Sequence, residues 1–331
     1  RSFHPTRVEM LPVALRQAAT TMTTGRPGPV NVDIPYNLFQ EYAEVKEEPV
    51  WNGFNSRRNG ASNEDVARVV DWLLAAERPV LFIGHGVTLS EAGDELVALA
   101  RRLSIPVISS PNGMGNIAMG DPLSLGFIGR NGAYASNQAG RHADLVLAVG
   151  ARFDDRSASS WKPGYSWNFP TTKLIHVDLD HAELGRNYAP DLAILADAKA
   201  FLRQILAELD RRSISNEPRL KPWHADIAGW KAEWQKFIQP GFKTHSSPIR
   251  PERIVADCRA VLPDDAIISL DSGIHHNWFM QFWEARRPRT MLNTWGYSGM
   301  GFGPSSILGA KLAAPDKVCV SICGDGGFTM V

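Results

Sequence analysis

Hydrophobic positions from Ser62 onward alternate between short continuous apolar runs and stripes at helical spacing. Continuous short runs predict buried strands, and apolar spacings of three and four predict helices that bury one face. The runs predict strands at 79–83, 105–109, 144–149, 173–178, 266–270 and 318–323. Strands that alternate with helices indicate parallel pairing. The pattern therefore predicts an α/β protein with doubly wound parallel sheets.

Two of the predicted helices begin after a serine. Ser62 precedes a stripe of Val and Leu and has Asp65 three residues later, and Ser90 precedes a helix that runs to Leu103. Because a serine hydroxyl can accept a hydrogen bond from a free backbone N–H of the first turn, both serines are predicted N-caps. Further helices are predicted at 197–211, at 251–262, from the turn 271–273 to Trp283, and from the Gly-rich segment 296–303 to Ala313.

The remaining segments contain fewer predicted elements. A helix is predicted at 6–24 and a short strand at 30–34, and residues 40–60 combine charge, Pro and Asn without periodicity, as a linker does. A second linker at 212–250 contains a helix with an aromatic stripe, which favours packing over a binding face. The stripe consists of Trp223, Ile227, Trp230, Trp234 and Phe237.

Composition narrows the class of protein. The chain has 331 residues, of which 44% are hydrophobic and 21% charged, and at about 150 residues per domain this length predicts two domains. Lys plus Arg and Asp plus Glu both number 35, so no net charge or basic stripe attracts nucleic acid or an anionic membrane. No apolar run reaches the roughly 18 residues of a membrane helix, and no signal peptide is expected.

The cysteines and the two ends of the chain add two expectations. Cys258, Cys319 and Cys323 are odd in number and lack a metal-binding spacing, which favours a reducing, cytoplasmic location. The chain starts at Arg1 without Met and stops at Val331, directly after an apolar strand and a Gly-rich turn. We therefore expect a fragment of a longer chain.

The last predicted strand is followed by Gly324-Asp325-Gly326-Gly327, which is the first candidate for chemistry. Ligands of open parallel sheets bind at the carboxyl ends of the strands, and glycines beside an acid let the backbone approach a phosphate closely. Asp325 is then placed to hold Mg²⁺, which prefers oxygen ligands and bridges to phosphate oxygens. Taken alone, the same residues also fit an ordinary turn after a strand.

Two other segments could contribute to the same site. Residues 293–310 are Gly-rich before a predicted helix, which suits either a phosphate-binding helix N-terminus or a tight packing turn. Asp271-Ser272-Gly273 is a further strand-end turn and leads into a His pair. No His-Glu-x-x-His or Cys-x-x-Cys motif is present, so zinc is rejected.

Together these segments resemble the thiamine-diphosphate-dependent enzymes of the acetolactate-synthase type. Gly324-Asp325-Gly326 resembles the start of their diphosphate motif, and Gly299-Met300-Gly301-Phe302-Gly303 resembles their Met-Gly-Phe-Gly segment. The resemblance implies that Asp325 is a Mg²⁺ ligand and that Met300 is catalytic because it props the cofactor into a bent shape. It also implies that Gly273, Ile274 and His275 line the diphosphate, with Ile274 in place of the family's usual Gln. The cofactor-binding residues implied at these strand ends are Gly273, Ile274, His275, Gly299, Met300, Gly301, Gly324, Asp325, Gly326 and Gly327.

The middle of the chain resembles the same family. Residues 150–156, Gly-Ala-Arg-Phe-Asp-Asp-Arg, closely resemble a family segment that contacts FAD. Residues 175–180 and 183–187 resemble two further segments of the family. This implies that Arg152 and Asp155 could bind FAD, although a salt-bridged turn fits the pair equally well. Gly-Arg-Asn-Gly-Ala at 129–133 stands where the family has the flavin contact Gly-Met-His-Gly-Thr. FAD therefore stays open, whereas thiamine diphosphate and Mg²⁺ are expected.

The resemblance divides the chain and implies its activity. It predicts the end of a pyrimidine-binding domain at 1–40, where 25–35 match the family, and linkers at 41–61 and 213–250. It also predicts a whole middle domain at 62–212 and the first half of a diphosphate-binding domain at 251–331. The implied activity is decarboxylation of a 2-oxo acid such as pyruvate with transfer of the acyl group to a second carbonyl, in a homodimer or homotetramer. Another thiamine-diphosphate decarboxylase or acetyltransferase, and a non-catalytic nucleotide-binding module, remain alternatives.

The same resemblance places two functional residues outside this chain. In the family, a Glu of the pyrimidine-binding domain drives ionisation of the cofactor, and an Asn beyond the Gly-Asp-Gly motif completes the metal site. Neither is expected among these 331 residues, so the chain by itself is predicted to be inactive.

Overall fold

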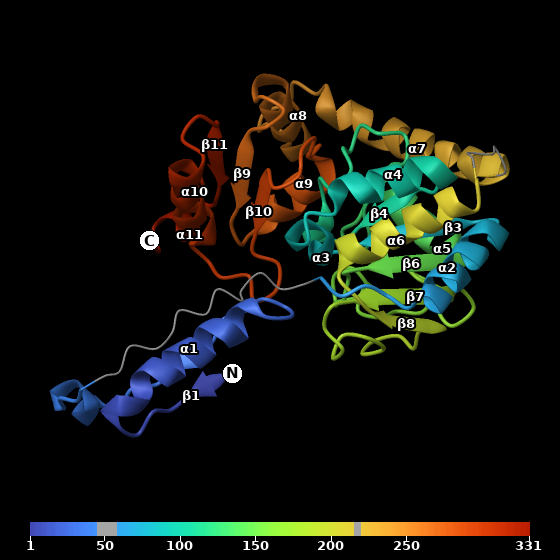
Figure 1. Ribbon diagram of the computed structural model, residues 1–331. Coiled ribbons are helices and arrows are strands. Elements are labelled where there is room, and N and C mark those ends of the chain that lie inside the picture. Colours follow the sequence, from blue (N-terminus) through green and yellow to red (C-terminus); the bar gives the residue numbers. More distant parts are fainter. Residues whose placement is uncertain (45–57, 215–219) are drawn as a thin grey trace. The chain divides into compact units, whose positions relative to one another are not determined.

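The computed structural model describes residues 1–44, 58–214 and 220–331. By its contacts the chain divides into two units, Arg1–Asn59 and Gly60–Val331 (Figure 1). Most of the predicted linker 41–61 lies outside the described residues, as do residues 215–219 of the second predicted linker.

The first unit is small. Strand β1 (Ser2–Phe3) pairs in parallel with β2 (Asn31–Val32), and helix α1 (Leu11–Thr23) connects them after the short 3-10 helix η1 (Val8–Met10). A second 3-10 helix, η2 (Tyr36–Gln40), follows. The predicted helix at 6–24 and the strand at 30–34 are both confirmed in shorter form.

The second unit contains a six-stranded parallel sheet with the order β5-β4-β3-β6-β7-β8. Chain order reverses between β3 and β6, so this pair forms the topological switch point of a doubly wound sheet. The predicted α/β class is thereby confirmed, and β3 and β7 have the predicted bounds. The strands are β3 (Pro79–Ile83), β4 (Val107–Ser109), β5 (Ser124–Phe127), β6 (Leu145–Val149), β7 (Lys173–Asp178) and β8 (Leu192–Leu195).

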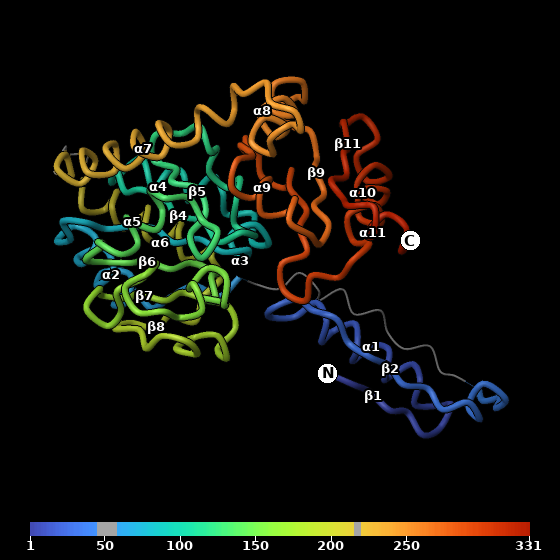
Figure 2. The backbone as a smooth tube through the Cα atoms, turned by 180° about the vertical axis from the view of Figure 1, so that it is seen from behind, coloured from blue at the N-terminus to red at the C-terminus, as the bar shows by residue number. Residues whose placement is uncertain are grey.

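Helices pack in groups against this sheet. Helices α2 and α4 both contact α6, whereas α5 contacts α7 (Figure 2). Strands β3 and β6 contain only buried residues because both of their faces are covered. The helices are α2 (Asn63–Ala75), α3 (His85–Leu89), α4 (Gly93–Leu103), α5 (Tyr134–His142), α6 (Ala198–Arg211) and α7 (Lys221–Phe242).

One of the two predicted serine caps is confirmed and the other is wrong. The Ser62 hydroxyl accepts from the Asp65 N–H at 3.0 Å and caps α2. Ser90 instead ends α3, and α4 begins at Gly93 without a side-chain cap. The Ser90 hydroxyl donates to Asp197 at 2.7 Å and accepts from the Lys199 N–H at 3.0 Å, so it supports the first turn of α6.

The aromatic stripe of α7 is only partly a packing stripe. Trp223 and Ile227 are buried in the main core, and Trp230 packs against that core. Trp234 is half-buried and its ring stacks on Phe282. Phe237 is 75% exposed, so the prediction of packing is wrong for this residue, which the turn of the helix carries away from the core.

A three-stranded parallel sheet follows, with the order β10-β9-β11. Its core includes Met114 and Phe127, which come from the six-stranded domain and pack with Ile268, Leu270 and Trp283. The two sheets of the second unit therefore share apolar packing. Its elements are α8 (Pro251–Val261), β9 (Ile267–Leu270), α9 (Ile274–Phe282), β10 (Met291–Asn293), α10 (Phe302–Ala313), β11 (Cys319–Ile322) and α11 (Asp325–Phe328).

None of the described helices is both long enough and apolar enough to cross a membrane.

Candidate functional site

The carboxyl ends of β9 and β11 bring the predicted site segments to one edge. Ile322 pairs with Leu270, and the Asp271 N–H donates to the Ile322 carbonyl at 2.9 Å. Both strands therefore end at the same level, and the turns after them lie side by side. This is the edge at which open parallel sheets bind their ligands.

Asp271 is the central residue of this edge, and the sequence did not single it out as a site residue. Its side chain is fully buried, and its Oδ1 accepts from the Ser272 N–H at 2.7 Å. Its Oδ2 accepts from the Gly301 N–H at 3.1 Å. A buried carboxylate is costly unless hydrogen bonds satisfy it. The Ser272 N–H satisfies it within the turn, and the Gly301 N–H joins this turn to the segment before α10.

Two glycines allow both neighbouring segments to approach Asp271. A Cβ added at Gly303 would lie 2.8 Å from the Cβ of Asp271, and one added at Gly327 would lie 2.2 Å from its Oδ2. The Gly-rich segment 299–303 and the turn 324–327 thus converge on one carboxylate. The structure brings together the predicted residues Gly301 and Gly327, which are far apart in sequence.

Asp325 is the first residue of α11 and is exposed. Within residues 1–44, 58–214 and 220–331, no group of three or more His, Cys, Asp or Glu side chains could hold a metal ion. Mg²⁺ is commonly held by one or two carboxylates together with phosphate oxygens and water. An exposed carboxylate between glycines at a strand end fits that role.

His275 lies on the first turn of α9, and its Nε2 is buried without a hydrogen-bond partner among the described residues. Gly273 has φ +156°, and a Cβ there would lie 2.5 Å from the ring of His275, so a side chain at this position would be strained. An unpaired buried ring nitrogen fits a phosphate oxygen, since an imidazole N–H can donate to it. Ile274 and Met300 are 62% and 63% exposed beside these turns.

The adjacent His276 is 5% exposed, and its ring lies 4.6 Å from that of Trp295. Burial lowers the pKa of His276 to about 4, with further lowering by nearby His275 and Arg156. This imidazole is therefore neutral at pH 7.

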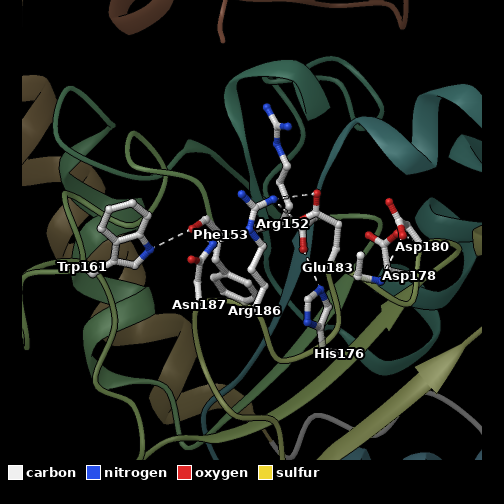
Figure 3. Close-up of polar contacts among 11 residues, drawn as sticks. Arg152, Phe153, Trp161, His176, Asp178, Asp180, Glu183, Arg186 and Asn187 are labelled. Atoms are coloured by element: carbon white, nitrogen blue, oxygen red, sulfur yellow. Dashed lines mark hydrogen bonds and ion pairs between the residues drawn. The ribbon is translucent and has the colours of Figure 1, made fainter. Parts of the chain in front are cut away.

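The loop after β6 carries the other two predicted residues. Arg152 is exposed, whereas Asp155 forms an ion pair with Arg130 and accepts from the Ser160 hydroxyl at 2.8 Å. The loop backbone is held by side chains, because Trp161 and Asn187 both donate to the Phe153 carbonyl at 3.1 Å (Figure 3). The ion pair of Asp155 therefore joins it to Arg130 of the loop at 129–133, and not to Arg152 within its own turn as the alternative to flavin binding described. Arg152 and Asp155 lie on one loop but not in the edge formed by β9 and β11.

At the switch point between β3 and β6, the backbones of the two turns that follow these strands contact each other. The Gly86 N–H donates to the Gly150 carbonyl at 3.1 Å, and a Cβ at Gly84 would lie 1.9 Å from that oxygen. Gly150 has φ +57°, which favours glycine. Since Gly150 already uses the Gly86 N–H, this amide is not free for a nucleotide phosphate.

Comparison with known proteins defines the class. The family described as "Thiamine pyrophosphate enzyme, central domain" matches residues 66–205. The family described as "Thiamine pyrophosphate enzyme, C-terminal TPP binding domain" matches 271–331, from Asp271 through the turn of Asp325. The chain therefore belongs to the thiamine pyrophosphate enzymes.

Within this class, the chain is similar to acetolactate synthases. It is 33% identical over 340 residues to the probable acetolactate synthase large subunit of Methanocaldococcus jannaschii, covering 99% of this chain and 56% of the relative. Identity to the acetolactate synthase large subunit of Haemophilus influenzae is 32%, over 99% of this chain and 56% of that protein. The probable acetolactate synthase 2, chloroplastic, of Oryza sativa subsp. japonica is 35% identical over 98% of this chain and 48% of its own length. The chain thus spans about half the length of these curated relatives.

Proposed function

We propose that this chain provides the cofactor-binding part of a thiamine-diphosphate- and Mg²⁺-dependent carboligase that acts on 2-oxo acids, as acetolactate synthase does. One observation carries the proposal: the Gly-rich segment before α10 and the turn of Asp325 converge on the buried carboxylate of Asp271. The match of residues 271–331 to a TPP-binding domain supports the same cofactor.

Each residue at this edge has a role in the proposal. Asp325 holds Mg²⁺, His275 donates to a phosphate oxygen, and the glycines at 324–327 allow close approach of the backbone. Met300 supports the bound cofactor from the segment that Asp271 anchors. When bound, thiamine diphosphate supplies the electron sink that 2-oxo acid decarboxylation requires.

The proposal extends to the organisation of the protein. Residues 1–40 form the end of a pyrimidine-binding domain, 62–212 the middle domain and 251–331 the diphosphate-binding domain, and the active protein is a homodimer or homotetramer. All three cysteines are free among the described residues, which supports a cytoplasmic location.

A flavin-free relative, such as a 2-oxo-acid decarboxylase or acetyltransferase, is the second candidate. The ion pair between Arg130 and Asp155 favours this candidate, because the pair joins the loops at 129–133 and 150–156, which are the two loops that would contact the flavin. Binding of FAD through Arg152 and Asp155 requires that this pair open. Flavin absorbance at about 450 nm in the purified full-length protein would favour the acetolactate-synthase branch.

Calorimetry on the full-length protein tests the cofactor. We expect thiamine diphosphate to bind with Mg²⁺ and to bind weakly after EDTA treatment, and Asp325→Ala to lose about tenfold or more in affinity. Asp316→Ala is the matched control, since Asp316 is an exposed acid that precedes β11 rather than following it. Equal binding by wild type and Asp325→Ala contradicts the assignment of the metal ligand, and no binding by wild type contradicts the proposed function.

Product analysis with pyruvate tests the reaction. We expect acetolactate from the full-length protein, whereas acetaldehyde alone would favour a decarboxylase.

A further inference from the structure

Five residues connect the central domain to the first turn of α9. The Asn131 amide donates to the Asn277 side-chain oxygen at 2.8 Å. The Arg156 guanidinium lies 4.3 Å from the Trp295 ring centroid, and the Trp295 ring also contacts the His276 ring at 4.6 Å between centroids. We call Asn131, Arg156, His276, Asn277 and Trp295 the interdomain cluster.

The central-domain side of this cluster is held rigidly. The Arg130 N–H donates to the Arg156 carbonyl at 3.1 Å, and Arg130 itself pairs with Asp155. A Cβ added at Gly129 would lie 1.9 Å from the same carbonyl oxygen, so the two loops touch at the backbone. Arg156 and Asn131 are therefore presented from a fixed pair of loops.

The other side of the cluster controls the backbone next to His275. His276 and Asn277 follow His275 directly on the first turn of α9, and the His276 N–H donates to the Gly273 carbonyl at 3.2 Å. His276 is buried and in contact with Trp295, and Asn277 accepts a hydrogen bond from Asn131 of the central domain. A rotation of this turn, which would displace the backbone of His275, would have to break both contacts.

We propose that Arg156 and Asn131 are positioning residues for the diphosphate site, which act through Trp295, His276 and Asn277 to hold His275 in place. The inference rests on the proposed binding of thiamine diphosphate and adds a role for the central domain in it. A charged guanidinium over an indole ring stabilises such an arrangement, and the hydrogen bond between the two amides fixes its register.

The experiment measures thiamine diphosphate affinity by calorimetry in the full-length protein, with Mg²⁺ and without substrate. We expect Arg156→Ala to weaken binding about fivefold, the scale of one lost cation–π contact, and Arg156→Lys to restore part of the loss because the charge remains. Asn131→Ala is expected to weaken binding about two- to fivefold.

Lys173→Ala is the matched control. The Lys173 ammonium lies 4.3 Å from the Trp72 ring centroid, the same distance as in the Arg156 contact. Lys173 is the first residue of β7, at the amino end of this strand and not at its carboxyl end. We expect this variant to bind the cofactor as wild type does. Comparing its Tm with that of Arg156→Ala separates positioning from a loss of stability.

The outcomes are distinct. The inference is supported if Arg156→Ala binds the cofactor more weakly although its Tm is no lower than that of Lys173→Ala, and if Arg156→Lys recovers part of the affinity. Wild-type affinity in Arg156→Ala and Asn131→Ala overturns it, as does a loss that Lys173→Ala shares. Should Arg156→Ala fail to fold, Trp295→Phe replaces it, since the smaller ring binds the cation less strongly. Failure of the wild type itself to bind contradicts the proposed function instead.

Discussion

The two parallel sheets of the second unit differ in how completely their strands are buried. Every residue of β3 and β6 is buried, whereas β10 and β11 have only half-buried residues around a buried β9. The six-stranded sheet is thus stabilised mainly by its own core. The three-stranded sheet depends more on its one buried strand and on the hydrogen bonds of Asp271. The candidate cofactor site lies on this less buried sheet.

The largest expected difference concerns the last residue of one strand in each sheet. Ile83 ends β3 and is fully buried, and Ile322 ends β11 and is half-buried. We expect Ile83→Ala to lower the free energy of unfolding by about 3–5 kcal/mol and Ile322→Ala by about 1–2 kcal/mol, since the removed groups differ in burial. Urea denaturation of the full-length protein measures both. Equal losses would mean that the two sheets are equally well packed.

The second prediction tests the junction at Asp271. Both of its oxygens accept from backbone N–H groups, and an asparagine has only one side-chain oxygen, so Asp271→Asn leaves one N–H facing an amino group. We expect thiamine diphosphate affinity to fall about tenfold, the scale of one lost charge-assisted bond. Asp257→Asn, at an exposed position of α8, is the control. Unchanged affinity would show that the half-buried sheet does not depend on this carboxylate.

The smallest expected effect compares one buried histidine in each sheet region. Burial lowers the pKa of His176 in β7, and it lowers that of His276 to about 4. In both cases the folded state takes up the proton at a lower pH than the unfolded chain, in which histidine titrates at about pH 6.5. The free energy of unfolding therefore has its full value above that pH and falls as the pH drops. For His276 this fall continues down to about pH 4.

We expect His276→Gln to remove about 1 kcal/mol per pH unit of this acid sensitivity between about pH 6 and 5. Urea midpoints at the two pH values measure it. His245→Gln, at an exposed position, serves as control. An acid slope equal to that of wild type would show that His276 is already protonated in the folded protein.

Much of the six-stranded fold follows from local sequence. The bounds of β3 and β7 and the Ser62 cap were predicted because long apolar runs and cap residues act over a few positions. Strand β5 (Ser124–Phe127) was missed because its four residues include Gly126 and Ser124, which carry no strand signal. The Ser90 cap was wrong because its partners, Asp197 and Lys199, come from a distant segment.

The candidate site was predicted in part for the same physical reason. The turn of Asp325 and the segment around Met300 stand out as motifs in the sequence. Asp271 does not, because its importance arises from contact with Gly301, 30 positions away. The ion pair of Arg130 with Asp155 likewise depends on two loops that meet only in the fold. Whether the predicted residues bind their ligands stays a prediction.

Met114 and Phe127 belong to the central domain by sequence but pack in the core of the three-stranded sheet, which carries the candidate cofactor site. A chimera that exchanged only residues 251–331 with a relative would have to match these two side chains in size and shape. Recombination between such enzymes is therefore constrained across this boundary, and successful exchanges should transfer both domains together.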